Sequence, residues 1–465
     1  MARMLMVQLQ IAPYVGTAYL NAATRRAGHE FAVHLVDGHE KTLGRIAAMK
    51  PSLIGFSCMT PLANKTLSLA AEIKKHFDIP IILGGPHPTL FPEVIQEDAV
   101  DMICRGEAEE TLPELLTAID RGQPYTGIRN LWVKQQGQIY RNPIRPLVDP
   151  LDNIPLIDWS CYRGTAALNS PPLAFPIRGC PFSCSYCFNA PLRKIYAGLG
   201  RPVRHFSASR SVQEIEQALE FFSPSPVLFA SDSFGIDLPW MSDFLDAYSA
   251  RIDLPFVLLL EPQLATETFV DLIAKHRCHC VALGVESGSE RVRREILNRR
   301  YTNQQLVAVA DRLHRRNIKI RTYNMVGLPT ETEAELWQTI DVNVQMKTEF
   351  PRGAIFTPLP GTQIVETALR EGYLEEGFSF KSIPTTILST TVLKKLDRDR
   401  VTNLLYFFQT AILFPKWRSL LKFLVSRKPN LLYRLWFSWV YVYLHRKSEN
   451  RKLIPYIKYV LRNPQ

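Results

Sequence analysis

Cysteine is scarce in this sequence, with eight residues in a chain of 465. So few cysteines cannot supply the disulfide framework of a small secreted scaffold. Three of them, Cys180, Cys184 and Cys187, are also too close together for three separate bridges. We therefore expect thiols in a reducing, cytoplasmic setting. The first residues, MARMLMVQLQ, lack the pattern of a secretory signal peptide, which agrees with this expectation.

Long hydrophobic runs are absent as well. The nearest candidate, residues 431–444, is too short for a membrane span and contains Arg434. Acidic residues are nearly absent near the C-terminus, where twelve Lys or Arg and one acid, Glu449, follow from Val401 onward. The net charge of +11 therefore comes from this region. This location argues against a nucleic-acid-binding protein and indicates one local basic, aromatic surface.

The chain is longer than most single domains, so we expect two or three. Residues 4–120 alternate five apolar strands with helical segments. This rhythm predicts a doubly wound parallel sheet that binds its ligands at the carboxyl ends of the strands. Residues 121–175 are rich in proline and contain one expected hairpin, NLWVKQQGQIYR.

From residue 176 the alternation of strands and helices resumes, with six strand-like segments beginning at FPIRG. Six such units predict a partial (β/α)6 barrel whose functional groups gather at the carboxyl ends of the strands. After about residue 385 only helical patterns remain. The expected fold is therefore α/β, with a Rossmann-like domain at 1–125, a linker at 126–172, a barrel at 173–384 and a helical region at 385–465.

The three clustered cysteines follow directly after the first expected barrel strand, in RGCPFSCSYCF. A structural zinc site normally takes four protein ligands, usually from paired C-x-x-C knuckles. Cys278 and Cys280 could be a distant half of such a site, but they alternate along an expected strand. A [4Fe–4S] cluster held by three thiolates instead leaves one iron open for a small molecule. The spacing favours such a cluster.

Cys180-x3-Cys184-x2-Cys187, with Tyr186 directly before the last cysteine, resembles the signature of the radical S-adenosylmethionine (SAM) enzymes. The resemblance implies a [4Fe–4S] cluster whose open iron chelates the amino and carboxylate groups of SAM. Electron transfer would cleave SAM to methionine and a 5′-deoxyadenosyl radical, which takes hydrogen from a substrate. It also implies a reductant such as flavodoxin or ferredoxin.

Other segments resemble the SAM-facing strand ends of that family, namely FASDSFGID (229–237), GVESGS (284–289) and MVGLPTET (325–332). Each also has a plainer interpretation, as a helix N-cap, a structural ion pair or a turn. The resemblance implies SAM contacts from Ser231, Asp232 and Ser233 to the amino-acid part, Glu286 and Ser287 to the ribose or carboxylate, Val326 and Gly327 to adenine, and Tyr186 beside the cluster.

The N-terminal segments ILGGPHPT (82–89) and ICRGEAEETLPELL (103–116) resemble the cobalamin-binding subgroup of these enzymes. Gly84 and Gly85 would let cobalamin approach the backbone closely, and Ser57 and Thr60 would offer hydroxyls to its nucleotide tail. A plain pair of turn glycines is the alternative. The loop after the first strand, QLQIAPYVGTAYL, lacks the histidine that many such domains supply to cobalt, and we do not expect His87 to replace it. Either cobalamin has no histidine lower ligand here, or the domain has lost cobalamin.

The sequence therefore predicts a cobalamin-dependent radical SAM methyltransferase acting on an unactivated carbon of a small-molecule or lipid substrate. A radical cyclase, oxidase or rearrangement enzyme without net methyl transfer is one alternative. A non-catalytic cluster- or cobalamin-binding module at a membrane surface is another. The aromatic helices beyond residue 385 favour either peripheral membrane contact or a cap on the barrel, and the two can coexist. The aromatic residues are Trp417, Trp436, Trp439, Tyr441 and Tyr443.

Overall fold

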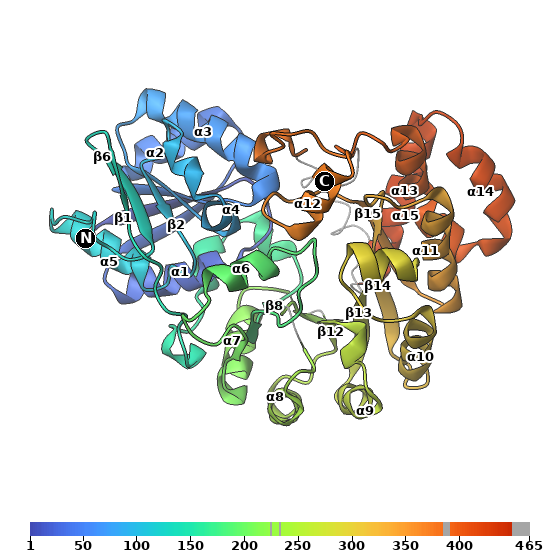
Figure 1. The fold of residues 1–465 in the computed structure, drawn as a ribbon. Helices are drawn as coiled ribbons and strands as arrows, with labels where there is room; N and C mark the ends of the chain where they lie inside the picture. The colour runs from blue at the N-terminus through green and yellow to red at the C-terminus, as the bar shows by residue number, and fades with distance from the viewer. Residues whose placement is uncertain (224–225, 232–233, 385–390, 449–465) are drawn as a thin grey trace. The chain divides into compact units, whose positions relative to one another are not determined.

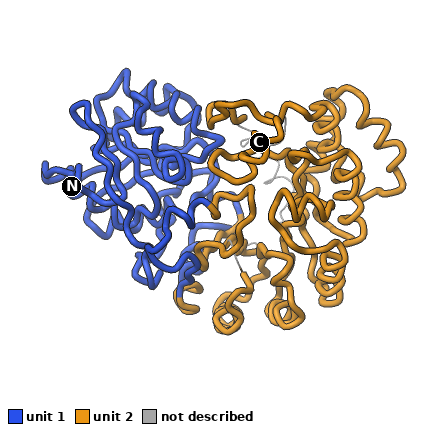
Figure 2. Tube along the Cα trace, viewed as in Figure 1, with its two compact units in different colours: residues 1–170, 191–206, 213–223 blue, residues 171–190, 207–212, 224–465 orange. Residues whose placement is uncertain are grey.

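The computed structural model describes residues 1–223, 226–231, 234–384 and 391–448. The chain divides into two units, which Figure 2 colours separately. Unit 1 contains residues 1–170, 191–206 and 213–223, and unit 2 contains residues 171–190, 207–212 and 224–465. Within the described ranges, no helix combines the length and the hydropathy that crossing a bilayer requires.

A seven-stranded sheet in the order β2-β1-β3-β4-β5-β6-β7 forms the centre of unit 1 (Figure 1). Strands β1 to β5 are parallel, as predicted. The expected hairpin is also confirmed, and it extends this sheet as the antiparallel strands β6 and β7. Gln136 and Gly137 join them with φ angles of 54° and 76°, which is the left-handed geometry of a tight hairpin turn. The strands are β1 (Arg3–Gln8), β2 (Glu30–Leu35), β3 (Leu53–Ser57), β4 (Ile81–Gly84), β5 (Met102–Cys104), β6 (Leu131–Gln135) and β7 (Gln138–Arg141).

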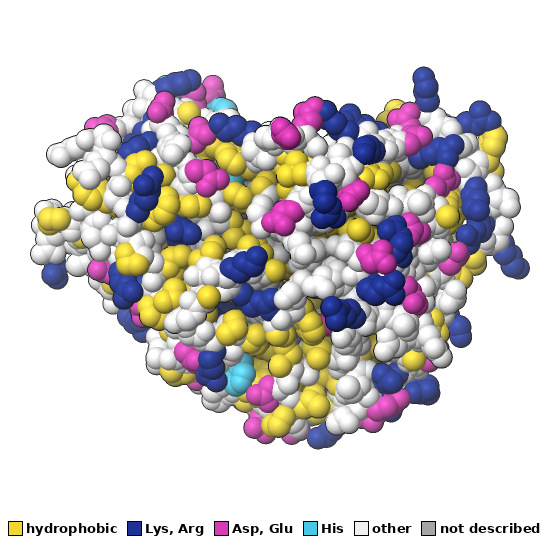
Figure 3. All heavy atoms as spheres, viewed as in Figure 1, with side chains coloured by type: hydrophobic (Ala, Val, Ile, Leu, Met, Phe, Trp, Pro, Cys, Tyr) yellow, Lys and Arg dark blue, Asp and Glu magenta, His cyan; other side chains and the backbone are white. Residues whose placement is uncertain are grey.

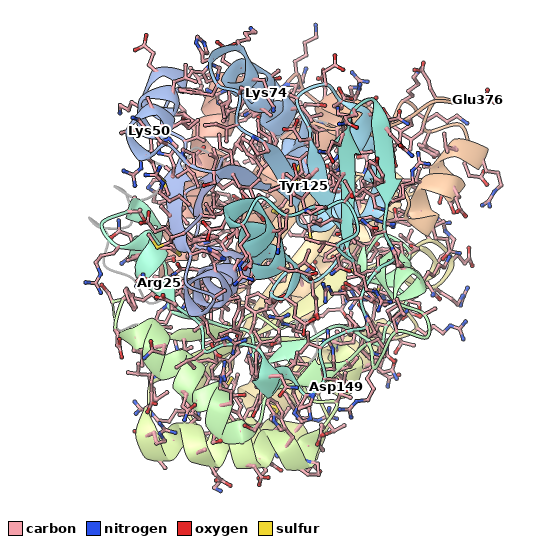
Figure 4. All side chains as sticks on the ribbon, turned by 90° about the vertical axis from the view of Figure 1, so that its left-hand side faces the viewer. Arg25, Lys50, Lys74, Tyr125, Asp149 and Glu376 are labelled. Atoms are coloured by element: carbon pink, nitrogen blue, oxygen red, sulfur yellow. The ribbon has the colours of Figure 1, made fainter. Side chains whose placement is uncertain are left out.

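Helices cover both faces of this sheet, because its buried strands present apolar side chains to both sides. Helices α1 and α5 pack on one face, and α2 and α3 pack on the other. Figure 4 shows this separation, with Arg25 of α1 on one side and Lys74 of α3 on the other. The helices are α1 (Val15–Arg26), α2 (His39–Met49), α3 (Ala63–His76), α4 (Pro86–Leu90) and α5 (Thr111–Asp120).

Unit 2 is built on a six-stranded parallel sheet in the order β15-β14-β13-β12-β11-β8. The strands follow one another in chain order, which confirms the predicted partial barrel. The predicted first strand, FPIRG, is wrong in its position. The barrel strand is β8, and Pro176, which has no N–H to donate, separates it from the short β9 (Ile177–Arg178) outside this sheet. The six strands are β8 (Leu173–Ala174), β11 (Val227–Phe229), β12 (Phe256–Leu260), β13 (Cys278–Glu286), β14 (Lys319–Val326) and β15 (Phe350–Ile355).

Several helices of unit 2 begin at a side chain that accepts a hydrogen bond from an amide of the first turn. Thr332, for example, accepts a hydrogen bond from the Glu335 amide, and the Glu335 side chain accepts one from the Thr332 amide. The helices of unit 2 that follow its strands are α8 (Leu238–Arg251), α9 (Glu267–Lys275), α10 (Asn303–His314), α11 (Glu333–Gln345) and α12 (Gln363–Arg370). Helices α6 (Asn189–Ile195) and α7 (Ala208–Leu219) span the points where the chain passes between the two units.

The C-terminal region is helical within the described residues, as predicted. Its helices are α13 (Arg398–Leu413), α14 (Arg418–Val425) and α15 (Leu431–Ser448). Helix α13 is buried along most of its length, and it packs in one core with Val326 of β14, Ile355 of β15 and Trp337 of α11. The region therefore caps the six-stranded sheet through α13.

Candidate functional site: a cysteine loop beside a buried charge cluster

The three cysteines lie on a loop between β9 and α6 that contains neither helix nor strand. All three are half-buried thiols outside any disulfide. The centre of the loop is fixed by hydrogen bonds from the Ser185 amide to the Leu297 carbonyl (3.1 Å), from Asn298 Nδ2 to the Ser183 carbonyl (2.9 Å) and from the Ile364 amide to the Ser185 carbonyl (3.0 Å). These bonds position Cys184 between two anchored neighbours.

Burial raises the pKa of Cys184 to about 11, and the positive charge of Arg299 partly opposes this shift. No three His, Cys, Asp or Glu side chains among the described residues converge as a ready metal site. The thiol chemistry nevertheless fits a cluster, because the three sulfurs share one irregular loop and none of them is in a disulfide. Ligation by Cys180, Cys184 and Cys187 stays a prediction.

Beside this loop, Arg299 bonds to residues from three segments of unit 2. Its Nη1 donates to the Tyr186 hydroxyl (2.6 Å) and to Glu286 Oε1 (3.2 Å), and its Nη2 donates to Glu261. The Tyr186 hydroxyl in turn donates to Glu286 Oε1 at 3.0 Å. Glu261 directly follows β12, Glu286 ends β13, and Tyr186 belongs to the cysteine loop. The cluster therefore joins the loop to the carboxyl ends of two barrel strands.

The charges in this cluster are largely withdrawn from water, with the Arg299, Glu261 and Glu286 side chains 5%, 12% and 13% exposed. Burial raises the pKa of both carboxyls, and Arg299 opposes that shift. One cation facing two carboxylates leaves a net negative charge when all three are ionised. SAM carries one net positive charge, from its sulfonium, ammonium and carboxylate groups. The charge cluster of Arg299, Glu261 and Glu286 is thus electrostatically suited to SAM.

The backbone around Glu286 departs from regular strand geometry. The register between β13 and β14 shifts at Gly284 and Glu286, and Glu286 has a φ of 65°. A left-handed conformation at a residue other than glycine costs free energy and is concentrated at functional sites. A Cβ on Gly284 would lie 2.8 Å from Glu286 Oε1 and 3.1 Å from Arg299 Nη1. Glycine at position 284 therefore leaves the space that the Glu286–Arg299 pair occupies.

Ser287 and Gly327 are linked to each other through Glu331. The Ser287 hydroxyl donates to Glu331 Oε1 (3.1 Å), while the Gly327 and Leu328 amides donate to Glu331 Oε2 (3.2 and 3.1 Å). Burial raises the pKa of Glu331 to about 8. The carboxyl thus connects the segment after β13 with the segment after β14. Contacts of Ser287 and Gly327 with SAM stay predictions.

Four further residues were predicted to contact SAM, namely Ser231, Asp232, Ser233 and Val326. The Ser231 hydroxyl is buried and accepts a hydrogen bond from the Ile177 amide (3.0 Å). Val326 ends β14 and is 1% exposed in the core beneath α13. The predictions for Asp232 and Ser233 fall outside the described residues. None of these four assignments is tested by the structure.

In unit 1, the predicted cobalamin residues Ser57, Gly84 and Gly85 line one apolar pocket of about 60 Å³. The strand order 2-1-3-4-5 reverses direction between β1 and β3, where doubly wound sheets bind their ligands. Ser57 lies at the carboxyl end of β3, beside this reversal. The pocket is lined by Met4, Met6, Leu20, Gly55, Phe56, Ser57, Ile82, Gly84, Gly85, Cys104, Ala108, Thr111 and Leu112.

Glycine is needed for different reasons at positions 84 and 85. Gly85 has φ 94° and ψ −168°, a region that only glycine readily adopts, so the backbone itself demands it. A Cβ on Gly84 would meet no chain atom closer than 4.0 Å. The packing of the protein therefore does not explain Gly84, whereas a ligand lying against the strand would. The apolar pocket and the open space at Gly84 leave room for a ligand, and contact with the nucleotide tail of cobalamin stays a prediction.

Thr60 and His87 are buried together in unit 1. The Thr60 Oγ1 and His87 Nδ1 atoms are 3.4 Å apart, and the His87 ring packs near Phe91 with 5.2 Å between ring centroids. Burial lowers the pKa of His87 to about 4. The hydroxyl of Thr60 thus has a partner within the chain, and its predicted contact with cobalamin is not tested.

Two members of the charge cluster, Glu261 and Arg299, were not predicted from the sequence. Glu261 follows an apolar strand as directly as Glu286 does, so the rule that barrel strands end in functional groups would have identified it. Arg299 lies beyond a π-helical turn (Val292–Ile296) in an Arg-Arg pair. No local pattern distinguishes it from the exposed Arg300.

Comparisons with known proteins agree with this arrangement. The profile of the radical SAM superfamily matches residues 175–342, and that of the B12 binding domain matches residues 7–116. An uncharacterized methyltransferase of Pyrococcus horikoshii is 25% identical over 84% of this chain and 86% of its own length. The anaerobic magnesium-protoporphyrin IX monomethyl ester cyclase of Rubrivivax gelatinosus is 25% identical over 89% of this chain and 78% of its own length.

A solved structure shares the fold. The radical SAM methyltransferase TsrM from Kitasatospora setae, with cobalamin and a [4Fe–4S] cluster bound, has a TM-score of 0.65 and 19% identity, covering 80% of this chain and 78% of its own. The two matched domains indicate a [4Fe–4S] cluster, SAM and cobalamin as cofactors. With both domains in one polypeptide, the chain belongs to the cobalamin-binding radical SAM enzymes.

Proposed function

We propose that this enzyme is a methyltransferase that adds a methyl group to an unactivated carbon. One observation carries the radical SAM part of the proposal: Tyr186 of the cysteine loop is bonded to Arg299 and Glu286, so the loop is held against the charged strand ends of the barrel. A relative that matches most of the chain is named a methyltransferase, and a B12 binding domain lies in the same chain, which supports methyl transfer in particular.

When bound, the cluster supplies the electron that cleaves SAM, and cobalamin supplies a carrier for the methyl group. Cys180, Cys184 and Cys187 would hold the cluster. Glu286 and Arg299 would orient SAM, because their charges are fixed by mutual hydrogen bonds and largely excluded from water. In unit 1, Gly84 would leave room for cobalamin.

A second candidate is a radical cyclase, oxidase or rearrangement enzyme that uses the same site without net methyl transfer. The similarity over most of the chain to a protein named as a cyclase favours it. The two candidates share every residue of the barrel site described above, so only the product separates them. A non-catalytic module would bind the same groups but would consume no SAM.

A radical SAM enzyme takes a reductant and a small substrate. We propose flavodoxin or ferredoxin as the reductant and an apolar small molecule or lipid as the substrate, in the cytoplasm. The support for an apolar substrate is the similarity to a protein named for a tetrapyrrole ester, together with the apolar C-terminal helices.

Anaerobic reconstitution with iron, sulfide, cobalamin and SAM, followed by reduction, tests the function. We expect 5′-deoxyadenosine together with S-adenosylhomocysteine, because one SAM is cleaved and another donates methyl. 5′-Deoxyadenosine without S-adenosylhomocysteine would favour the cyclase candidate, and neither product would refute both enzymes. Comparing metabolite and lipid profiles with and without the gene, for a product heavier by one CH2, would then identify the substrate.

A further inference from the structure

Helix α15 is apolar on two opposite sides, although only one side is packed. Phe437, Val440 and Leu444 recur at intervals of three and four residues and face the protein, with Phe437 in the core that α13 shares. On the opposite side, Leu432, Leu435 and Trp439 are 74%, 55% and 61% exposed. A helix that is apolar all round is normally buried all round. The exposed side of α15 therefore calls for a partner.

We define the outer face of α15 as Leu432, Leu435, Trp436, Trp439 and Tyr443. Its aromatic rings form a continuous row, with centroid distances of 5.6 Å from Trp436 to Trp439 and 5.8 Å from Trp439 to Tyr443. Trp436 Nε1 donates to the Thr410 hydroxyl of α13 at 2.8 Å, which fixes one end of the row. Tryptophan and tyrosine are the residues that favour the boundary between water and lipid.

The neighbouring helix α14 adds to this surface. Leu420 and Phe423 of α14 are each 54% exposed, and Arg427 lies over the Phe423 ring at 4.2 Å. On α15, Lys447 lies over the Tyr443 ring at 4.7 Å. Figure 3 shows Lys and Arg side chains on unit 2 around α11 and α14, with Asp and Glu side chains among them. Each helix thus has a cation beside an exposed aromatic ring.

The charge of this region indicates the kind of partner. Residues 401–448 contain eight Lys or Arg and no Asp or Glu. A second copy of the chain, bound through the same face by two-fold symmetry, would place cations against cations. An anionic lipid surface instead matches both the cations and the apolar row, because its negative potential attracts Lys and Arg side chains.

From these observations we propose that the outer face of α15, together with Leu420 and Phe423 of α14, docks the enzyme onto an anionic membrane surface. No described helix could span the bilayer, so α15 would lie in the interface with its aromatic row among the headgroups. The docking is independent of the reaction, since none of the contacting residues belongs to the cysteine loop or the charge cluster.

The test is co-sedimentation of the purified protein with vesicles of equal parts phosphatidylcholine and phosphatidylglycerol, or of phosphatidylcholine alone. We expect at least tenfold tighter binding to the anionic vesicles at about 0.1 M salt, and weaker binding at about 1 M salt, where screening is stronger. The double variant Leu435→Ser/Trp439→Ser should lose at least tenfold in binding. Arg434→Glu/Lys447→Glu should prefer the anionic vesicles less strongly than the wild type does, because six Lys or Arg of residues 401–448 remain.

The matched control is Leu156→Ser/Leu369→Ser, which removes two exposed leucines elsewhere, 36% and 37% exposed, and should bind like the wild type. Unchanged thermal unfolding of every variant shows that the fold is intact. Equal binding of wild type to both vesicle types, or wild-type binding by Leu435→Ser/Trp439→Ser, would overturn the proposal. So would a dimer in sedimentation equilibrium that this variant dissociates, because the occupant would then be a second copy.

Discussion

Alanine at Gly84 and alanine at Gly85 should have opposite effects, although the residues are neighbours on the rim of one pocket. Gly85 has a backbone conformation nearly restricted to glycine, and its Cβ would lie 3.1 Å from the Cys58 carbonyl oxygen. Gly85→Ala should therefore lower the free energy of unfolding by about 1–3 kcal/mol. A Cβ at Gly84 meets open space, so Gly84→Ala should leave stability unchanged or raise it by up to about 1 kcal/mol.

Gly84→Ala should weaken cobalamin binding, although it should not lower stability. If cobalamin lies against this strand, the added methyl group would overlap it, and overpacking of this kind costs about 1–3 kcal/mol. That range corresponds to about 5- to 150-fold weaker binding. Gly85→Ala should change the free energy of cobalamin binding by less than the free energy of unfolding, because its added methyl group is directed at the Cys58 backbone.

Two measurements separate these effects. Chemical denaturation of the cobalamin-free protein gives the unfolding free energies, and the corrin absorption retained after dialysis gives the affinities. Wild-type affinity in Gly84→Ala would refute the reasoning, because the open space would then not be ligand space. Destabilisation of Gly84→Ala by as much as Gly85→Ala would show that the packing around the pocket differs from that described.

Three further outcomes are expected. Cys184→Ala should abolish the iron content and the cluster absorption with the fold intact, whereas Cys161→Ala should preserve both; an intact cluster in Cys184→Ala would contradict the assignment. Arg299→Met should cost about 3–5 kcal/mol of stability and weaken SAM binding, because it leaves two buried carboxyls without their cation. Chemical denaturation and a SAM titration measure the two effects. The control variant Arg300→Met should change neither stability nor SAM binding. Burial raises the pKa of Glu331 in the folded protein to about 8, so the protonated carboxyl stabilises the fold. This stabilisation is complete below the ordinary pKa of glutamate and should be lost as the pH rises toward 8. The free energy of unfolding should fall by up to about 1.4 kcal/mol per pH unit in this range. Glu331→Gln should flatten that pH dependence in thermal unfolding, and an unchanged slope would exclude Glu331 as its source.

The elements predicted from sequence are those whose signal is local. Both parallel sheets were predicted from the alternation of strands and helices, and the hairpin at 131–141 was predicted from its local sequence. The cysteine loop and Glu286 were found because each belongs to a short motif directly after a strand. FPIRG was misplaced because the barrel strand β8 ends just before this segment, and Pro176 separates β8 from the short β9.

What could not be predicted depends on contacts between distant segments. Arg299 is a cluster residue only because the chain after the π-helical turn returns to β12 and β13. Likewise, the sequence places Gly84 and Gly85 side by side with identical chemistry, and only the backbone angles and neighbouring atoms distinguish their roles.

The carboxyl of Glu331 has a consequence for engineering this enzyme. It binds Ser287 on one segment and the amides of Gly327 and Leu328 on the next, so the two segments share one anchor. Replacing either segment alone with that of a relative would leave a buried acceptor without its donors or donors without their acceptor. Chimeras that aim to change the substrate should therefore exchange residues 287–289 and 327–331 together, as one cassette.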